Sequence, residues 1–383
     1  MYKKKSVFFA ACTGMLLFGI SIITLGSVAA GLKEKFNLDD ISSGTLFSIL
    51  PIGVLAGSLI FGPFCDKYGY KLFLVLSSLC MFAGFQCIAL ASSINLLKVS
   101  IFIFGMGGGA INGAANAVVS DVSFENKRTN LSLLGVFFAL GALGMPFILG
   151  LLENRFNFET IVSAVSSLTI IAAIFFLIIK FPPPKQKEGV PFSQGLNLLR
   201  DPVLILIAFF LFCQSSLEGI INNWTTNYLI NQLRITESGA LYALSLFVAG
   251  MAVMRILIGS VFRKMTSQNI LILSFGLSIA GSLLIKFAGS YAAAVTGLIL
   301  IGAGLAAGFP LMLGFVGNRY AQLSGTAFSI VLVIALIGNM LVNLLMGYIA
   351  EKWGIKHLTT LAFIEIFFLI LLSMIILNKL KQT

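Results

Sequence analysis

The sequence predicts an all-α, polytopic membrane protein, and three observations support this class. Of the 383 residues, 58% are hydrophobic and only 10% are charged, whereas soluble domains carry about a quarter charged residues. The mean hydropathy is +1.02. Twelve apolar runs are long enough to cross a hydrocarbon core about 30 Å thick, which needs about 20 helical residues. Lipid, rather than water, is therefore the main solvent of this chain.

The twelve runs are bounded by charged residues, proline or clusters of glycine. They are too long for the strands of an outer-membrane barrel, and they lack the alternation of apolar and polar residues that such strands need. In chain order the predicted spans cover residues 6–32, 44–65, 72–92, 97–120, 131–152, 160–181, 202–230, 239–262, 268–288, 292–316, 324–350 and 357–378. The first span follows three lysines, as a signal peptide would, but its apolar stretch is longer than a typical signal core.

The net charge of +11 is explained by membrane topology. With both termini on one side of the bilayer, that side holds 16 Lys and Arg residues and the other side holds eight. Because Lys and Arg collect in cytoplasmic loops, we predict that both termini are cytoplasmic, in a bacterial inner membrane. We expect no nucleic-acid partner. The five cysteines lie in apolar runs and lack framework spacing, so we expect no metal site and no cofactor.

The chain divides into two similar halves. Its longest polar interruption begins at Pro182, between the sixth and seventh predicted spans. A shift of 197 residues aligns small residues of the halves: Gly53 with Gly250, Gly62 with Gly259, Ser77 with Ser274, Gly105 with Gly302, Gly107 with Gly304, Ser132 with Ser329, Gly141 with Gly338 and Gly150 with Gly347. Such repeats build many secondary transporters, with the substrate site between the halves. We predict an N-terminal six-helix bundle over residues 1–181, a cytoplasmic linker over 182–201 and a C-terminal bundle over 202–383.

The segment after the second span carries a family resemblance. It reads Gly62-Pro63-Phe64-Cys65-Asp66-Lys67-Tyr68-Gly69-Tyr70-Lys71. This resembles the signature loop of the major facilitator superfamily, in which Gly, three residues, Asp, a basic residue, any residue and Gly precede two basic positions. Tyr70 departs from the first of these positions. The resemblance covers essentially the whole chain and implies two pseudo-symmetric six-helix bundles, with a gating loop that contains Gly62, Asp66, Lys67, Gly69 and Lys71. The plain alternative is a positively charged turn.

Two further stretches resemble the fucose-galactose-glucose/proton symporter group of that superfamily. One is Gly113-Ala114-Ala115-Asn116 in the fourth span, and the other is Glu218-Gly219 with Asn223-Trp224 and Tyr228-Leu229 in the seventh. The resemblance implies inward cotransport of a sugar or sugar-like solute with a proton. The group's usual acids are missing, however, because the first span has no acid and the position in the fourth is Asn112. Either Glu218 binds the proton instead, or the protein is a uniporter or uses another ion.

Glu218, near the middle of the seventh span, is the leading candidate for binding both ligand and proton. At about 100° per residue, one face of this helix carries Gln214, Glu218, Asn222 and Thr225. Carboxylates accept hydrogen bonds from hydroxyls, and amides both accept and donate, so this face suits a polyhydroxylated ligand. The alternative is that the polar face holds two helices together.

Two amide pairs have helical i, i+4 spacing, Asn112 with Asn116 in the fourth span and Asn339 with Asn343 in the eleventh. We expect these pairs to bracket the ligand from the two halves, or else to join helices by hydrogen bonds. Trp224 is expected to stack on the apolar face of a sugar.

Two more ionisable residues lie within spans, where charge is costly. Arg255, in the eighth span, is expected at nearly the depth of Glu218. We hypothesise an ion pair that opens when Glu218 binds a proton or a hydroxyl, with a purely structural pair as the alternative. Glu365, in the outer part of the last span, is expected near the membrane interface.

The sequence therefore predicts a monomeric secondary transporter that takes up a sugar-like solute by alternating access, coupled to a proton. An exporter or antiporter of drugs or metabolites is the nearest alternative, although Met145-Pro146 stands where such antiporters often carry Gly-Pro. A sugar uniporter is a second alternative. A non-transporting sensor or lipid-handling protein would need a cytoplasmic signalling domain or a lateral, lipid-lined groove, and no loop exceeds about 20 residues, too few for a folded signalling domain. No catalytic set, metal-ligand spacing or phosphate loop favours an enzyme.

Overall fold

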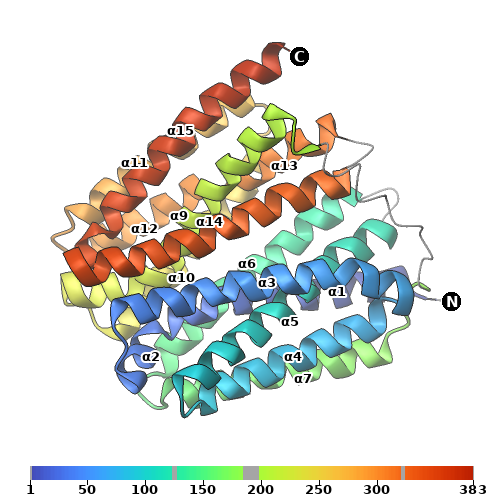
Figure 1. Ribbon diagram of the computed structural model, residues 1–383, viewed down its shortest axis with the longest axis horizontal. Helices are drawn as coiled ribbons and strands as arrows, with labels where there is room; N and C mark the ends of the chain where they lie inside the picture. Colours follow the sequence, from blue (N-terminus) through green and yellow to red (C-terminus); the bar gives the residue numbers. More distant parts are fainter. Residues whose placement is uncertain (1, 123–126, 184–197, 321–323, 383) are drawn as a thin grey trace. The chain divides into compact units, whose positions relative to one another are not determined.

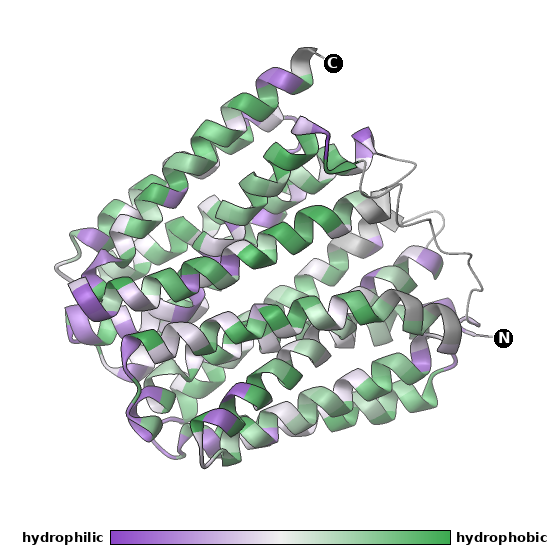
Figure 2. Ribbon diagram, viewed as in Figure 1, coloured by the Kyte–Doolittle hydropathy of each residue, from purple (hydrophilic) through white to green (hydrophobic). Residues whose placement is uncertain are grey.

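The computed structural model describes residues 2–122, 127–183, 198–320 and 324–382, and each regular element in these ranges is a helix. Twelve helical segments of the described chain are long and apolar enough to cross a membrane. The predicted all-α class with twelve spans is therefore confirmed. Figure 1 shows the helices, coloured from the N-terminus to the C-terminus. Figure 2 shows that they are largely apolar along their lengths, with hydrophilic residues gathered at turns and helix ends.

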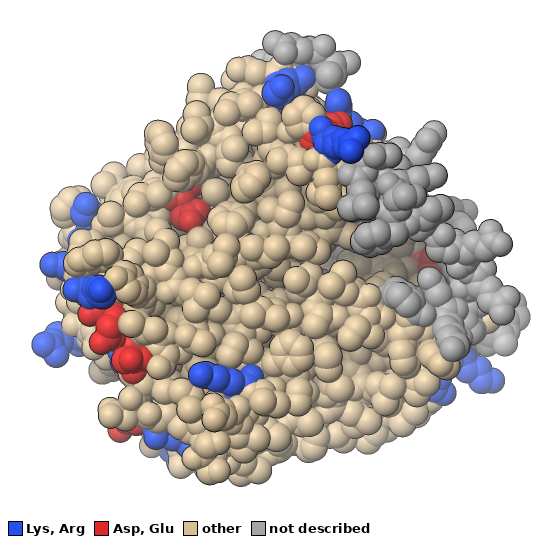
Figure 3. Space-filling model, in the orientation of Figure 1, with Lys and Arg blue, Asp and Glu red and all other residues tan. Residues whose placement is uncertain are grey.

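The outer surface of the helices is apolar. Large side chains such as Phe9, Ile171 and Phe367 are exposed to between 58% and 62%. On the face seen in Figure 3, Lys, Arg, Asp and Glu gather mainly toward the helix ends, and the surface between them is almost free of charge. A soluble protein would not expose so much apolar surface, whereas lipid chains can cover it. The chain is thus a multi-pass membrane protein.

The chain folds into two compact units, residues 1–39 with 45–188 and residues 40–44 with 189–383. The first unit contains α1 (Lys4–Ser27), α2 (Ala29–Phe36), α3 (Asp40–Tyr68) beyond its first turn, α4 (Tyr70–Leu90), α5 (Ile94–Val122), α6 (Lys127–Leu152) and α7 (Phe158–Ile178). The domain limits drawn from the sequence stay a prediction, and residues 184–197 of the predicted linker lie outside the described residues.

The second unit begins again with a long helix. It contains α9 (Pro202–Leu233), α10 (Glu237–Gly259), α11 (Ser267–Lys286), α12 (Tyr291–Leu305), α13 (Gly308–Arg319), α14 (Ser324–Trp353), the 3-10 helix η2 (Ile355–His357) and α15 (Leu358–Gln382). Its packing repeats that of the first unit. Helix α1 packs against α5 and α6, as α9 packs against α12 and α14, and α4 packs against α5 and α7, as α11 packs against α12 and α15.

Equivalent glycines make the close helix crossings of the two units. A Cβ atom on Gly105 would lie 2.6 Å from the carbonyl oxygen of Leu50, and one on Gly302 would collide with the carbonyl oxygen of Phe247. Leu50 and Phe247 are themselves 197 residues apart. The same holds for two further aligned pairs, Gly53 with Gly250 and Gly107 with Gly304. In each pair, the added Cβ atoms would approach carbonyl oxygens of residues that are 197 positions apart. The internal repeat in the sequence therefore marks equivalent positions at which two helix backbones approach closely, as small residues permit.

Two of the predicted spans are interrupted. The first ends at Ser27 and is followed after Val28 by the short helix α2. The predicted span 292–316 is two helices, because α12 ends at Leu305 and α13 begins at Gly308. Pro310 explains this break, since a proline has no N–H to donate and its ring clashes with the carbonyl four residues earlier.

The repeated glycine crossings predict the effect of a single methyl group. We expect Gly302→Ala to destabilise the protein by about 1–3 kcal/mol, because the added Cβ overlaps backbone that cannot easily move. The matched control is Gly276→Ala in α11, where the added Cβ would meet nothing within 4 Å. Thermal unfolding of the purified variants in detergent measures both. Equal melting temperatures for the two variants would contradict a role for the crossing in stability.

Candidate functional site

Helix α9 carries a dense run of buried polar side chains between Gln214 and Asn227. It packs against α10, α12, α13, α14 and α15 of its own unit. In hydrocarbon such groups need partners within the protein. These polar groups fall into two sets, those with a hydrogen-bond partner in the described residues and those without one.

Asn343 of α14 joins the two helices through its side-chain amide. Its Oδ1 accepts hydrogen bonds from Asn223 Nδ2 at 3.1 Å and from Trp224 Nε1 at 3.2 Å. Its Nδ2 donates to Asn339 Oδ1 at 2.9 Å. Trp224 is fully buried. Its indole therefore has a structural partner and offers no face for a sugar in this conformation.

Asn339 extends the same contact along α9. Its Nδ2 donates to the carbonyl oxygen of Ser215 at 3.0 Å. Gly219 makes this approach possible, because a Cβ there would lie 2.5 Å from Asn339 Nδ2. We call this set the amide seam; it consists of Ser215, Gly219, Asn223, Trp224, Asn339 and Asn343. Three residues predicted to bind ligand, Trp224, Asn339 and Asn343, thus have hydrogen-bond partners in the seam.

Gln214 lies at the break between α12 and α13. Its Nε2 donates to the carbonyl oxygen of Leu305, the last residue of α12, at 2.9 Å. Gly308 leaves room for the amide, since a Cβ there would collide with Gln214 Oε1. The side chain is only 2% exposed. Gln214 therefore supplies a donor to a carbonyl at the end of the interrupted helix.

Glu218 and Arg255 lie in the same unit and interact electrostatically. No ion pair within 4.0 Å joins them, and Glu218 makes no hydrogen bond to another described residue. Glu218 is partly accessible. The Nε of Arg255 is buried without a partner. The opening and closing of this pair stays a prediction, and here the two side chains are not in direct contact.

Asn222, one turn beyond Glu218 on α9, is also incompletely paired. It is 6% exposed, and its Oδ1 has no hydrogen-bond partner among the described residues. A buried polar atom without a partner is costly and calls for an explanation. Glu218 and Asn222 are therefore the two predicted ligand groups on α9 that the protein itself leaves available.

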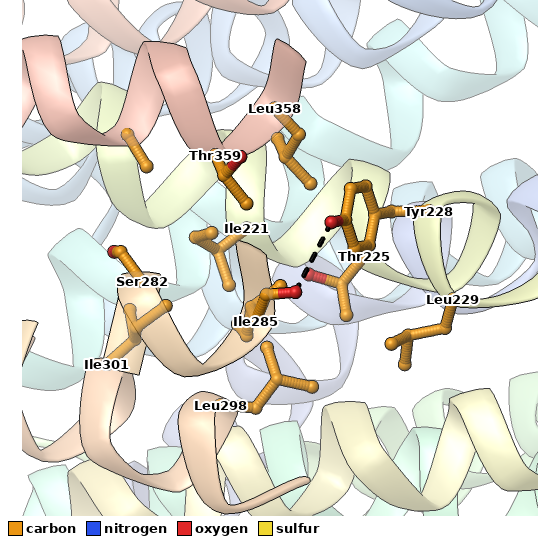
Figure 4. A pocket seen from close by; sticks show the side chains of 11 residues that line it. Ile221, Thr225, Tyr228, Leu229, Ser282, Ile285, Leu298, Ile301, Leu358 and Thr359 are labelled. Atoms are coloured by element: carbon orange, nitrogen blue, oxygen red, sulfur yellow. Dashed lines mark hydrogen bonds between the residues drawn. The ribbon is translucent and has the colours of Figure 1, made fainter. Parts of the chain in front are cut away.

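Thr225, the fourth residue of the predicted face, lines a small cavity between α9, α11, α12 and α15 (Figure 4). The cavity is otherwise mostly apolar, but the Ser282 hydroxyl is buried there without a partner. The Tyr228 hydroxyl donates to the carbonyl oxygen of Ile285 at 3.4 Å. The cavity has a free volume of about 10 Å³, which is enough for roughly one water molecule and too small for a sugar.

The amide pair of the first unit is bonded to itself. Asn116 Nδ2 donates to the carbonyl oxygen of Asn112 at 2.9 Å and to its Oδ1 at 3.0 Å, and it lies 3.8 Å from Met15 Sδ. Both asparagines are partly accessible. A bracket of amides from the two halves stays a prediction.

The predicted gating loop is mainly helical. Helix α3 continues to Tyr68 and α4 begins at Tyr70, so that Gly69 alone lies between them, with a φ of +82° that favours glycine. Lys71 is exposed in the first turn of α4. The Tyr70 hydroxyl, at the position where the motif departs from a base, donates to Asp121 Oδ2 at 2.7 Å. The surroundings of Gly62 and the side chains of Asp66 and Lys67 lie outside the described residues.

One buried acid lies against α9. The sequence predicts Glu365 near the membrane interface, but this residue is only 6% exposed and lies beside Cys213 and Ser216 of α9. The span that contains it begins at Ile355, so Glu365 lies almost three turns inside. The expected position near the membrane interface stays a prediction, and the burial of Glu365 against α9 is what the apolar run around it does not indicate.

At the N-terminal end of α9, Asp201, Arg319 and Tyr320 form a charged cluster next to the apolar spans. Arg319 Nε is 3.6 Å from Asp201 Oδ2, and Asp201 caps α9 by accepting a hydrogen bond from the Val203 N–H at 2.8 Å. Burial acts to raise the pKa of Asp201, but the neighbouring Tyr320 hydroxyl, the Val203 N–H and Arg319 outweigh it, and the net pKa is lowered. Burial, with Asp201 nearby, raises the pKa of Tyr320 to about 12.

Comparison with known proteins agrees with this architecture. The family model described as the Major Facilitator Superfamily matches residues 9–335. The chain is 25% identical to the glucose/mannose transporter GlcP of Bacillus subtilis, over 91% of this chain and 88% of that protein. It is 23% identical to the sodium-dependent glucose transporter 1 of Xenopus laevis, over 86% and 73% of the two chains.

A solved structure shows the same fold. The crystal structure of a D-xylose-proton symporter superposes with a TM-score of 0.82, covering 97% of both chains at 13% sequence identity. At this identity the likeness concerns the arrangement of the helices.

The cluster around Asp201 predicts a pH-dependent stability. Because its pKa is lowered on folding, the ionised group stabilises the fold above its unfolded pKa of about 3.9, and this contribution is lost as the pH falls through the folded value. We expect Asp201→Asn to lower the melting temperature at neutral pH, by an amount that corresponds to about 1 kcal/mol or less because the pair is partly exposed.

Thermal unfolding in detergent at neutral and acid pH tests this expectation. The difference between Asp201→Asn and the wild type should shrink as the pH is lowered. Glu34→Gln, a change at an exposed acid, is the control and should give no such trend. A difference that stays constant with pH would contradict the role of the ionised carboxylate.

Proposed function

The chain belongs to the Major Facilitator Superfamily, and from that premise we propose that it takes up a sugar or sugar-like small polar solute across a membrane by alternating access. It is a membrane transporter and not an enzyme. The observation that carries the substrate class is the likeness to the glucose/mannose transporter GlcP over 91% of this chain. The sodium-dependent glucose transporter of Xenopus laevis supports the same class.

The ligand contacts proposed here follow from the unpaired groups on α9. Glu218 makes no hydrogen bond to a described residue, and Asn222 Oδ1 has no partner. A carboxylate and an amide one helical turn apart can accept and donate hydrogen bonds to neighbouring hydroxyls of a sugar. Asn112 and Asn116 are proposed to contribute from the first unit. The amide seam and Gln214 instead hold the second unit together.

Topology is proposed from charge. The side that holds both termini carries 16 Lys and Arg residues and the other side carries eight, so we assign the termini to the cytoplasm of a bacterial cell and the chain to its inner membrane. We propose that the transporter works as a monomer, because one chain contains both compact units of the repeat. With this topology, the gating loop from Gly62 to Lys71 lies at the cytoplasmic face.

Coupling to a proton is proposed to depend on Glu218. The first span contains no acid and the fourth carries Asn112, so Glu218, near the middle of α9, is the acid among the proposed ligand contacts. Arg255 interacts with Glu218 electrostatically, and its positive charge balances the negative charge of Glu218 when the proton leaves. Sodium coupling and uniport are the alternatives, and the experiment below separates them.

Reconstituted protein tests the proposed function directly. Radiolabelled D-glucose uptake into proteoliposomes is measured with an inward proton gradient, with an inward sodium gradient and with neither. We expect saturable uptake in all three and accumulation above equilibrium with the proton gradient alone. Accumulation with sodium alone would reassign the ion, and equilibration under all conditions would indicate a uniporter. Absence of saturable uptake of every hexose and pentose would overturn the substrate class.

Glu218→Gln is the variant that tests the proposed contact. A hydrogen bond to a charged group contributes about 1.5–3 kcal/mol, so loss of the carboxylate should raise the KM for sugar about 10- to 100-fold. It should also abolish gradient-driven accumulation, because an amide cannot carry the proton. The control is Glu237→Gln, at an exposed acid in the first turn of α10. Normal accumulation by Glu218→Gln would contradict the assignment.

A further inference from the structure

Glu365 of α15 is a buried acid for which the proposed transport cycle has no use. It is 6% exposed, and its Oε2 has no hydrogen-bond partner. Its neighbours on α9 include Cys213 and Ser216, but its carboxyl group makes no hydrogen bond to a described residue. No cation lies within 4.0 Å of it in the described part of the chain. An ionised carboxylate in hydrocarbon normally pairs with a base or faces water.

The surroundings of Glu365 commit no hydrogen-bond donor to an ionised carboxylate. The Ser216 hydroxyl donates to the carbonyl oxygen of Phe212 at 2.7 Å. The Cys213 thiol is only a weak donor. A carboxylate here would be buried without a cation or a committed donor, whereas a neutral carboxylic acid avoids the cost of a buried charge.

Charged groups on the other elements packed against α15 do not change this balance. On α9, Glu218 lies five residues from Cys213 and thus about 140° round the helix axis. On α11 the charged residue is Lys286, at the last position of the helix, where its ammonium stands over the Phe363 ring at 5.7 Å. The charged or titratable residues at the end of α14 and in η2 are Glu351, Lys352, Lys356 and His357.

We propose that Glu365 is a proton-binding site within the membrane, between α15 and α9. In the resting protein the buried acid holds its proton. Loss of this proton would leave a buried anion without a partner, so the proton leaves only when α9 and α15 separate or water enters. This site rests on the packing of the second unit and is independent of the identity of the transported solute.

Infrared spectroscopy tests the proposal without any substrate. The C=O stretch of a neutral carboxylic acid is distinct from the bands of a carboxylate, and spectra are taken of the purified transporter at neutral pH in a maltoside detergent, which has no ester carbonyl. We expect an acid C=O band in the wild type that Glu365→Gln removes. Glu237→Gln, at an exposed acid, should leave that band unchanged. Glu218 can add an acid band of its own in both proteins, so the measured quantity is the difference between them: unchanged acid C=O intensity in Glu365→Gln, or loss of a carboxylate band instead, would overturn the proposal.

Glu365→Asp gives a second measurement that keeps an acid at this position. A carboxyl group on the shorter side chain stays within the same buried surroundings, so an acid C=O band should remain but at a different frequency. If Glu365→Gln does not fold, this shift decides the question, and a band identical to that of the wild type would overturn the proposal. Failure of D-glucose uptake would bear on the proposed substrate and would leave both infrared results intact.

Discussion

The structure of the second unit depends on one constraint, which is that a polar group within hydrocarbon has to find its partner inside the protein. Helix α9 carries more such groups than a lipid-facing helix could tolerate, and the helices around it supply the partners. Asn343 accepts from two residues of α9, and Gln214 reaches the carbonyl of Leu305 at the broken span. The glycines at 219 and 308 exist at these contacts because any side chain there would occupy the space of the amides.

This constraint separates structural polar groups from available ones. The amide seam is internally satisfied, and its Trp224 is fully buried. Glu218 and the Oδ1 of Asn222 have no described partner, although they share the same helix. Residue type alone cannot make this distinction, because asparagines occur in both sets. The available groups are the ones for which a ligand is the natural partner, and the proposed transport function rests on them.

Most of the fold could be predicted from the sequence. The length of the twelve apolar runs is a local property of the sequence, and the 197-residue shift marks the equivalent crossings at Gly105 and Gly302 because small residues recur where helices approach closely. The site was harder to predict, because helical spacing places Gln214, Glu218 and Asn222 on one face without saying what lies opposite each. The break before α13 and the burial of Glu365 likewise depend on neighbouring helices that a single sequence does not identify.

Asn222 belongs to the available set and Asn343 to the structural one, and D-glucose stabilisation of the two alanine variants distinguishes these roles. Melting temperatures are measured with and without the sugar. We expect Asn222→Ala to melt close to the wild type without sugar and to lose the sugar-induced increase. Asn343→Ala should melt lower, because two buried donors lose their acceptor, and should still be stabilised by D-glucose. The opposite pattern would contradict the account.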